Sequence, residues 1–406
     1  MENLELELEK NRQTEIVEPY KLPTGWKWCK QSEVCKLVDG EKIADKEYPY
    51  LEVKYLRGTK EKSFVTSGKL IKKGTKVILV DGENSGEVFT VPEDGFMGST
   101  FKALSIQNVD ENYLQFFIQT KKDLYRNNKK GSAIPHLNKE LFFNMPFPLP
   151  PTLAEQQRIV NRIETMFAKL DEAKEKAQNA VDSFETRKAA ILHKAFNGQL
   201  KIDNEELSIE DWEDTTIGEC CRLGSGGTPS KSHPEYYENG DIPWLKTGEI
   251  DWNDIYDVEE RITNEGVENS SAKIFPAESV VVAMYGMGVT RGKAAIIKIP
   301  TTTNQAVCVL QPNEKLNNRF LFYYFMCNYW QIREQSVGGN QLNLSGKIIA
   351  SFPIKLPPLN YQLSIVNFLD TVLEKESRAK EAAQTVLDQI ALLKKSILAR
   401  AFRGKI

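Results

Sequence analysis

The most regular hydrophobic pattern of the chain is a heptad seam, which occurs in two long segments. Apolar side chains alternate at spacings of four and three residues, as in a helix that packs along one face. The first seam consists of Ile159, Ile163, Met166, Leu170, Ala173, Ala177, Ala180 and Phe184. The second consists of Ile365, Leu369, Val372, Ala379, Ala383, Val386 and Ile390, and only Glu376 interrupts it. Each segment predicts a helix of roughly 43 residues, about 65 Å long at ~1.5 Å per residue.

Both predicted helices carry signals at their ends. Thr152 and Glu155 fit a capping box at the start of the first helix. Gly198 and Gly404 stand where the end of a helix favours a left-handed residue. Small alanines along both seams permit close approach, so the simplest assembly is an antiparallel coiled coil between the two helices. Pairing of each helix with other chains is the alternative.

The two helical segments belong to a tandem duplication. The stretch "ILHKAFNGQL" (191–200) returns as "ILARAFRGKI" (397–406), and the match extends back over 131–200 and 338–406. A weaker echo links "WKWCKQSEVCKL" (26–37) to "WEDTTIGECCRL" (212–223). Each repeat is thus a divergent region followed by a better-preserved helical segment.

The divergent regions have the pattern of mixed α/β structure. Strand-like runs bounded by turn residues occur at 76–80, 88–91, 279–285, 293–299 and 306–312. Shorter helices are predicted at 110–126 and 317–336, which are equivalent places in the two repeats. The predicted fold class is α+β: two α/β domains in tandem, each followed by a long helix, with the helices paired antiparallel about a pseudo-twofold axis.

The composition is that of an ordinary globular protein, with 41% hydrophobic residues, 27% charged residues and a net charge of −3. The longest apolar runs are too short for a bilayer, which takes roughly 20 residues, and the acidic N-terminus does not resemble a signal peptide. Six cysteines without CxxC spacing indicate reduced, mostly buried thiols. A cytoplasmic location is therefore expected.

No constellation typical of an enzyme stands out. His136, His193 and His233 are scattered, so no metal site is predicted. "NMPF" (144–147) is close to the Asn-Pro-Pro-Tyr/Phe motif of amino-methyltransferases, but the second repeat has "SFPI" there and no Gly-rich cofactor loop accompanies it. The chain is predicted to be non-catalytic, with an enzyme as the rejected alternative.

Several motifs resemble the specificity subunit of type I restriction–modification systems. In the second repeat these are "GSGGTPS" (224–230), "IPWLKTGEI" (242–250), "NQAVCVLQP" (304–312) and "IKLPPLNYQLSIV" (354–366). In the first repeat they include "YPYLEVKYLRG" (48–58), "LVDGENSGEVF" (79–89), "GFMGSTFKAL" (95–104) and "FPLPPTLAEQQRIV" (147–160). The resemblance runs from about residue 20 to the end of the chain.

The resemblance implies a domain order and a set of partners. The order is an N-terminal acidic segment (1–20), target-recognition domain 1 (21–150), conserved helix 1 as spacer (151–200), target-recognition domain 2 (201–357) and conserved helix 2 as spacer (358–406). Such a subunit binds a bipartite DNA site and directs two methyltransferase and two restriction subunits to it. S-adenosylmethionine, ATP and Mg²⁺ belong to those partners, so no cofactor is expected in this chain. A non-catalytic coiled-coil adaptor for protein partners is the alternative.

Local charge gives mixed support for DNA binding. Residues 21–130 contain 20 Lys and Arg against 15 Asp and Glu, which suits phosphate contacts, whereas residues 210–340 contain 11 against 19. The second domain would need its basic residues clustered on one face. Because the two regions differ strongly in sequence, the two half-sites are expected to differ.

Candidate DNA-binding residues are polar side chains in loops that could approach base edges or phosphates. In the first domain they are Lys54, Tyr55, Arg57, Asn84, Ser85, Ser99, Thr100, Lys102, Lys129, Lys130 and Ser132. In the second they are Thr228, Ser230, Lys231, Lys246, Thr247, Tyr285, Met287, Arg291, Asn304, Gln305, Asn340 and Gln341. The two Asn-Gln pairs are favoured because amides can pair bidentately with adenine. The alternative is that these residues only cap turns.

Overall fold

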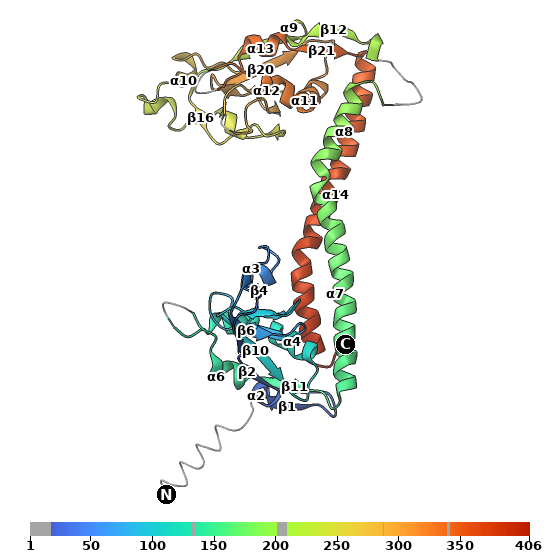
Figure 1. Ribbon diagram of the computed structural model, residues 1–406. Coiled ribbons are helices and arrows are strands. Elements are labelled where there is room, and N and C mark those ends of the chain that lie inside the picture. Colours follow the sequence, from blue (N-terminus) through green and yellow to red (C-terminus); the bar gives the residue numbers. More distant parts are fainter. Residues whose placement is uncertain (1–17, 132–134, 201–208, 287, 339–341) are drawn as a thin grey trace. The chain divides into compact units, whose positions relative to one another are not determined.

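The computed structural model describes residues 18–131, 135–200, 209–286, 288–338 and 342–406 (Figure 1). The chain divides into two compact units. The first unit runs to Gln178 and resumes with Gln384–Ile406, and the second is Asn179–Ala383. Each unit therefore contains one divergent region together with parts of both long helical segments.

The first unit combines short strands and helices with the long helix α7. Its strands are β1 (Lys27–Lys30), β2 (Cys35–Val38), β3 (Glu41–Ile43), β4 (Tyr48–Leu51), β5 (Phe64–Val65), β6 (Gly68–Ile71), β7 (Lys76–Leu79), β8 (Val88–Thr90), β9 (Gly95–Met97), β10 (Phe101–Ile106) and β11 (Pro146–Leu149). Its helices are α2 (Gln31–Val34), α3 (Val53–Leu56), α4 (Glu111–Thr120), α5 (Lys122–Asn127), α6 (Lys139–Phe143) and α7 (Leu153–Asp182), which ends just beyond the unit boundary.

Two sheets and a β1–β11 ribbon form the framework of the first unit. One sheet is antiparallel in the order β2-β10-β7-β8, and the other has the order β3-β6-β9-β4-β5. The main core packs α4 against β11, the start of α7 and the end of α14 (Leu359–Ala401). Phe117, Phe147 and Phe402 meet there, with ring centroids 4.8 and 5.4 Å from that of Phe117.

The second unit repeats this plan of a two-stranded ribbon and two sheets, but the sheets contain different numbers of strands. Its strands are β12 (Glu213–Thr216), β13 (Cys221–Ser225), β14 (Ile242–Leu245), β15 (Asp254–Ile255), β16 (Arg261–Ile262), β17 (Val280–Ala283), β18 (Ala294–Ile297), β19 (Thr302–Thr303), β20 (Val307–Pro312) and β21 (Pro353–Leu356). Its helices are α8 (Phe184–Phe196), α9 (Ile217–Cys220), α10 (Asn264–Glu268), α11 (Asn318–Cys327), α12 (Tyr329–Glu334), α13 (Gly346–Ser351) and the first part of α14.

The main sheet of the second unit has the order β13-β20-β17-β18-β15, and a smaller sheet has the order β16-β14-β19. Its strands β17 and β18 are buried on both faces, which explains their continuous apolar runs. Helix α11 packs with the end of α8 in the main core, where the ring centroids of Phe196 and Phe320 are 5.0 Å apart. The predicted strands are thus confirmed, and each predicted shorter helix is present but divided in two, into α4 and α5 in the first unit and α11 and α12 in the second.

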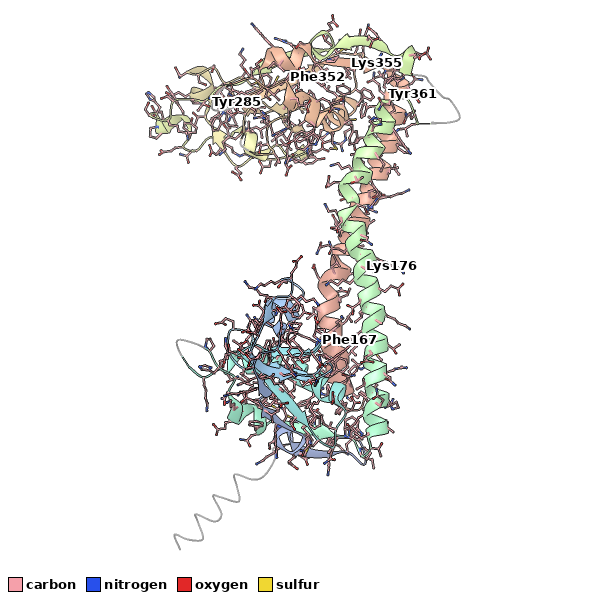
Figure 2. The ribbon with its side chains drawn as sticks, in the orientation of Figure 1. Phe167, Lys176, Tyr285, Phe352, Lys355 and Tyr361 are labelled. Carbon is pink, nitrogen blue, oxygen red and sulfur yellow. The ribbon has the colours of Figure 1, made fainter. Side chains whose placement is uncertain are left out.

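Within each unit the two long helical segments run antiparallel. In the first, Arg158 Nη2 donates to Ile406 O at 3.2 Å and Lys394 pairs with Asp171 at 2.6 Å. Figure 2 marks Phe167, whose ring lies 4.9 Å from Lys394 Nζ. In the second, Arg187 pairs with Glu376 at 2.8 Å, so the polar break in the second seam has a partner.

The seam prediction is wrong at two places in the second helix. Ala379 and Val386 are exposed, whereas Ala383 between them is half-buried and Ile390 beyond them is buried. The first helix is divided at Ser183 into α7 and α8, where the Ser183 Oγ donates to Asn179 O at 2.5 Å. The backbone bonds from Ser183 N to Asn179 O at 3.1 Å and from Arg187 N to Ser183 O at 3.0 Å continue across this point. Gly198 and Gly404 adopt the predicted left-handed conformation, with φ of 65° and 66°.

A buried glutamine in each "LPP" segment joins the long helix to the divergent region. Gln156 Oε1 accepts from Asp110 N at 2.7 Å, and Gln362 Oε1 accepts from Asn317 N at 2.9 Å. Asp110 and Asn317 are the N-caps of α4 and α11, respectively. Both glutamines are almost fully buried, so the repeated motif fixes the same joint in both units.

The cysteines and apolar segments agree with the expectations from composition. All six cysteines are free and five are buried, and burial raises the pKa of the Cys35 and Cys221 thiols to about 12. Among the described residues, no helix has the length and apolar character needed to cross a bilayer.

Candidate nucleic-acid interface

The candidate residues of the second unit gather at one end of its main sheet. Strand β13 ends where β20 begins, because Ser225 pairs with Cys308, and β17 ends beside the same point, because Ala283 pairs with Val307. The segments that follow or precede these strands therefore meet: 226–230, 284–286 with 288–292, and 304–306. Sequence separation alone did not reveal this convergence.

Direct contacts join the candidates at this sheet end. Thr228 Oγ1 donates to Gln305 Oε1 at 2.6 Å. Asn304 N donates to Leu245 O at 3.0 Å, which brings the neighbouring Lys246 and Thr247 to the same edge. Lys246 is paired with Glu260 at 2.5 Å, so its charge is already balanced. Asn304 Oδ1 accepts from Ala306 N at 3.1 Å, the turn-capping role that was the alternative for this residue.

The β17–β18 loop carries Tyr285, which Figure 2 marks and which is 38% exposed, and Arg291. Arg291 Nη1 donates to Leu342 O at 2.7 Å, and Val337 pairs with Asn343 in an isolated bridge. Leu344 N donates to Met284 O at 2.9 Å. The β17–β18 loop and the segment before α13 thus form a pair of loops at the sheet end.

The first unit has an equivalent loop pair. Leu137 N donates to Val80 O and Gly82 N to Pro135 O, both at 2.7 Å, so the β7–β8 turn meets the segment before α6. Val80 N also donates to Thr100 O at 2.8 Å, which adds the turn containing Ser99 and Thr100. Arg57 joins the edge through its ion pair with Glu87, in the β7–β8 turn.

Ion pairs balance most of the positive charge at this first edge. Lys129 pairs with Glu83 at 2.7 Å, Lys130 with Glu140 at 3.1 Å and His136 with Asp81 at 2.6 Å. Lys102 and Lys69 both pair with Asp39, at 2.8 and 2.6 Å, and these contacts lower the pKa of that carboxyl to about 2. These pairs leave the net charge of the region unchanged, but they engage the individual lysines that were candidates for phosphate contacts.

Other candidates of the first domain differ in exposure and position. Ser85 is fully buried and its hydroxyl has no partner among the described residues, so a surface contact with DNA would need the turn to open. Asn84 in the same turn is half-buried. Lys54 and Tyr55 lie in helix α3, not in a loop, and the Tyr55 hydroxyl donates to Glu93.

In the second domain, Ser230 ends the 226–230 segment and Lys231 follows it. Both are exposed, and Ser230 Oγ lies 2.7 Å from Ser232 Oγ. Four candidates lie outside the described residues: Ser132, Met287, Asn340 and Gln341. The Asn340-Gln341 pair, one of the two favoured for adenine, therefore stays a prediction.

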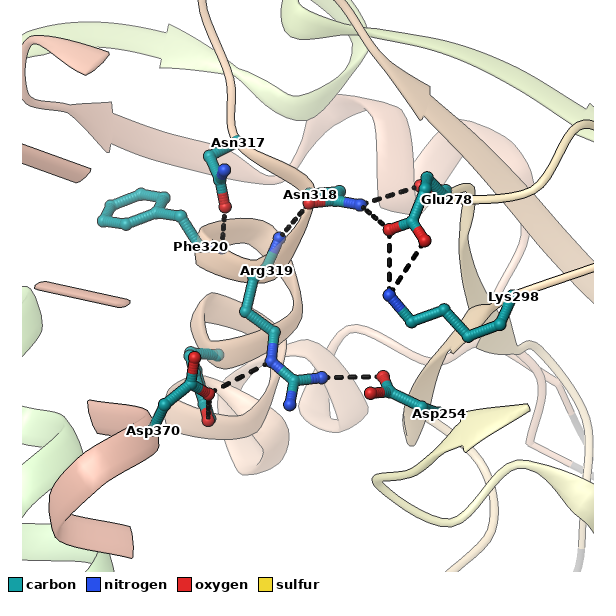
Figure 3. A network of polar contacts seen from close by, with 9 residues as sticks. Asp254, Glu278, Lys298, Asn317, Asn318, Arg319, Phe320 and Asp370 are labelled. Atoms are coloured by element: carbon teal, nitrogen blue, oxygen red, sulfur yellow. Dashed lines mark hydrogen bonds and ion pairs between the residues drawn. The ribbon is translucent and has the colours of Figure 1, made fainter. Parts of the chain in front are cut away.

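An arginine that the sequence analysis did not single out anchors α11 (Figure 3). Arg319 Nη1 donates to Asp254 Oδ1 at 2.7 Å, and its Nε donates to Asp370 Oδ1 of α14 at 3.2 Å. The adjacent Asn318 Nδ2 donates to Glu278 Oε2 at 2.7 Å, and Glu278 also pairs with Lys298. These contacts link α14 to α11 and to β15, at the edge of the main sheet of the second unit. No local sequence signal marks Arg319, because its partners Asp254 and Asp370 come from distant segments.

The second unit also has an apolar cavity of about 840 Å³ between α8, the α11–α12 corner and β21. Trp212, Trp252, Tyr329 and Trp330 are among its walls. Lys355, marked in Figure 2, lines the cavity and pairs with Asp214 at 2.7 Å. Its walls include none of the candidate DNA-binding residues.

Two units of the same plan, each presenting a cluster of loops at one sheet end, define a tandemly duplicated α+β recognition protein. The family model described as "Type I restriction modification DNA specificity domain" matches the chain twice, over residues 23–182 and 209–386. The chain belongs to this family, which confirms both the resemblance and the duplication.

Individual relatives agree with this assignment. The type I restriction enzyme MjaVIII specificity subunit of Methanocaldococcus jannaschii is 28% identical, covering 95% of this chain and 94% of the relative. The EcoR124I/EcoR124II specificity subunit of Escherichia coli is 31% identical over 39% of this chain and 40% of its own. The crystal structure of the HsdS subunit from Thermoanaerobacter tengcongensis has a TM-score of 0.68 at 20% identity, covering 96% and 99% of the two chains, and supports the fold.

Proposed function

We propose that this chain is the DNA sequence-recognition subunit of a type I restriction–modification complex. It binds a bipartite site, reading one half with each target-recognition domain, and it contributes no catalytic group. The observation that carries the proposal is the pair of equivalent sheet ends, one in each unit, where loops of divergent sequence converge. The two frameworks are equivalent but their loop residues differ, so each unit is suited to a different half-site. The recognised DNA sequence is therefore asymmetric.

The long helical segments suit a second role, that of docking the partner subunits. They carry the sequence that the two repeats share most closely, whereas the loops at the sheet ends differ. Two methyltransferase subunits, one per repeat, and two restriction subunits then complete the complex. S-adenosylmethionine, ATP and Mg²⁺ are bound by those partners in the cytoplasm, and this chain selects the DNA on which they act.

The test is to co-express the chain with its methyltransferase subunit in a host without DNA methylation and to map modified bases across the genome. We expect one bipartite motif with methylated adenine in both halves and different sequences in the two halves. A palindromic motif would contradict the asymmetric site. No new methylation, with the methyltransferase shown to be active alongside another specificity subunit, would contradict the proposal and favour the protein-binding adaptor.

A further inference from the structure

Two arginines without acidic partners lie at the loop pair of the second unit. Arg291 lies in the β17–β18 loop, and Arg333 lies in α12. Among the described residues, neither guanidinium takes part in an ion pair, in contrast to Lys129, Lys130 and His136 of the first unit. Residues 210–340 contain fewer basic than acidic residues. Two neighbouring arginines without carboxylate partners are therefore a distinct feature of this domain.

Arg333 is fully engaged in holding the loop. Its Nη2 donates to Gly288 O at 2.7 Å, and its Nη1 donates to Arg291 O and to the Tyr329 hydroxyl. The guanidinium also lies 5.1 Å from the centre of the Tyr329 ring. A Cβ at Gly292 would lie 3.1 Å from Arg333 Cγ, and this residue has φ of 87°, so glycine permits the close approach.

Arg291, in contrast, has donors to spare. Its Nη1 donates to the carbonyl of Leu342, and its Nε is buried without a partner and is closed to an external anion. Nη2 has no partner among the described residues and is the donor available to a ligand. Burial, and then the positive charge of Arg333, lower the pKa of Arg291, and no carboxylate offsets them. An arginine with an unpaired terminal nitrogen, beside a second positive charge, is suited to an anion with several acceptor oxygens.

We propose that Arg291 binds a phosphate of the DNA backbone beside the second half-site, and that Arg333 is a positioning residue that fixes the loop carrying it. The inference rests on the proposed function and specifies one contact within it. A phosphate fits better than a carboxylate of a protein partner, because the loop pair stands at the sheet end where Thr228, Asn304 and Gln305 also converge. Such a contact increases affinity on any sequence and leaves the recognised bases unchanged.

The test measures DNA binding by the full-length chain with its methyltransferase subunit, over a range of salt concentrations. Arg291→Ala should reduce the slope of log K against log[salt] by about 0.9, the value for one phosphate contact, and should leave the methylated motif unchanged. Arg291→Lys should retain most of the slope. The matched control is Arg222→Ala, because Arg222 is exposed and lies in β13 at the other end of the sheet. This variant should change neither the salt slope nor the methylated motif.

The positioning role of Arg333 is tested by a double-mutant cycle. With Arg333→Ala in place, adding Arg291→Ala should no longer change the slope, because the loop is already released. An unchanged slope in Arg291→Ala, while the wild type binds and methylates its site, would overturn the phosphate contact alone. A changed second half of the motif would assign Arg291 to base readout instead. Absence of site-directed binding by the wild type would overturn the proposed function itself.

Discussion

Phe196 and Phe402 occupy the same position in the two units, one at the end of each long helical segment. The Phe196 ring centre lies 5.0 Å from that of Phe320 in α11, and the Phe402 ring centre lies 5.0 Å from that of Tyr113 in α4. Phe196 belongs to the first repeat but completes the core of the second unit, and Phe402 does the reverse. The repeated "AF" near positions 195 and 401 is therefore preserved because each helix end fills the core of the other domain.

Replacing either phenylalanine should destabilise one unit selectively. Phe402→Ala is expected to lower the free energy of unfolding of the first unit by about 3–5 kcal/mol, because a large buried ring leaves a cavity. Phe196→Ala should do the same to the second unit. Hydrogen exchange followed by peptide mass spectrometry assigns the loss to each unit. Leu392→Ala, at a position 67% exposed on α14, is the control, and equal loss in both units from either variant would contradict the assignment.

The buried glutamines of the "LPP" segments should matter more than their neighbours. Gln362→Leu removes the acceptor for Asn317 N and the donor for Lys315 O, so unfolding free energy should fall by about 1–3 kcal/mol. Gln156→Leu should act in the same way in the first unit. Gln157→Ala, an exposed neighbour, is the control, with a change within about 0.5 kcal/mol. Denaturant unfolding measures the difference, and equal effects at 156 and 157 would refute the role.

The Arg319 network should stabilise the second unit and leave the recognised sequence unaffected. Arg319→Ala leaves Asp254 and Asp370 without their cation, and we expect a loss of about 1–3 kcal/mol in unfolding free energy. Arg378→Ala removes an exposed pair with Glu374 on α14 and should cost less than about 1 kcal/mol. Thermal unfolding of the two variants provides the comparison. An altered methylation motif in Arg319→Ala would indicate that this arginine also reads DNA.

Acid should weaken the first unit through Asp39. Lys102 and Lys69 lower the pKa of this carboxyl from 3.8 to about 2 in the folded chain. Because the folded pKa is the lower one, the stabilisation is present above about pH 4 and is lost as the pH falls towards 2. Asp39→Asn should therefore show a shallower loss of stability in that window. Glu61→Gln, an exposed residue with no ion pair among the described residues, should follow the wild type.

Much of the architecture follows from the sequence alone. The heptad seams, the duplicated ends and the apolar runs of β7, β17 and β20 are local patterns, so they predict helices and strands without knowledge of distant contacts. The left-handed Gly198 and Gly404 were predictable for the same reason, since a helix end is a local event. The sequence motifs also identified the family that the family model confirms.

Only the tertiary structure decided which candidates carry free charge and which are buried. Lys246 and Lys129 are equally basic in the sequence, but each has a carboxylate from a distant segment as its partner. Ser85 is a residue type that is common in exposed turns, but its side chain is fully buried. Arg333 approaches the Arg291 loop across 42 positions of sequence. Periodicity and turn chemistry act between residues that are close in the sequence, so the sequence alone determines them. Ion pairing and burial depend on segments that folding brings together, so only the tertiary structure decides them.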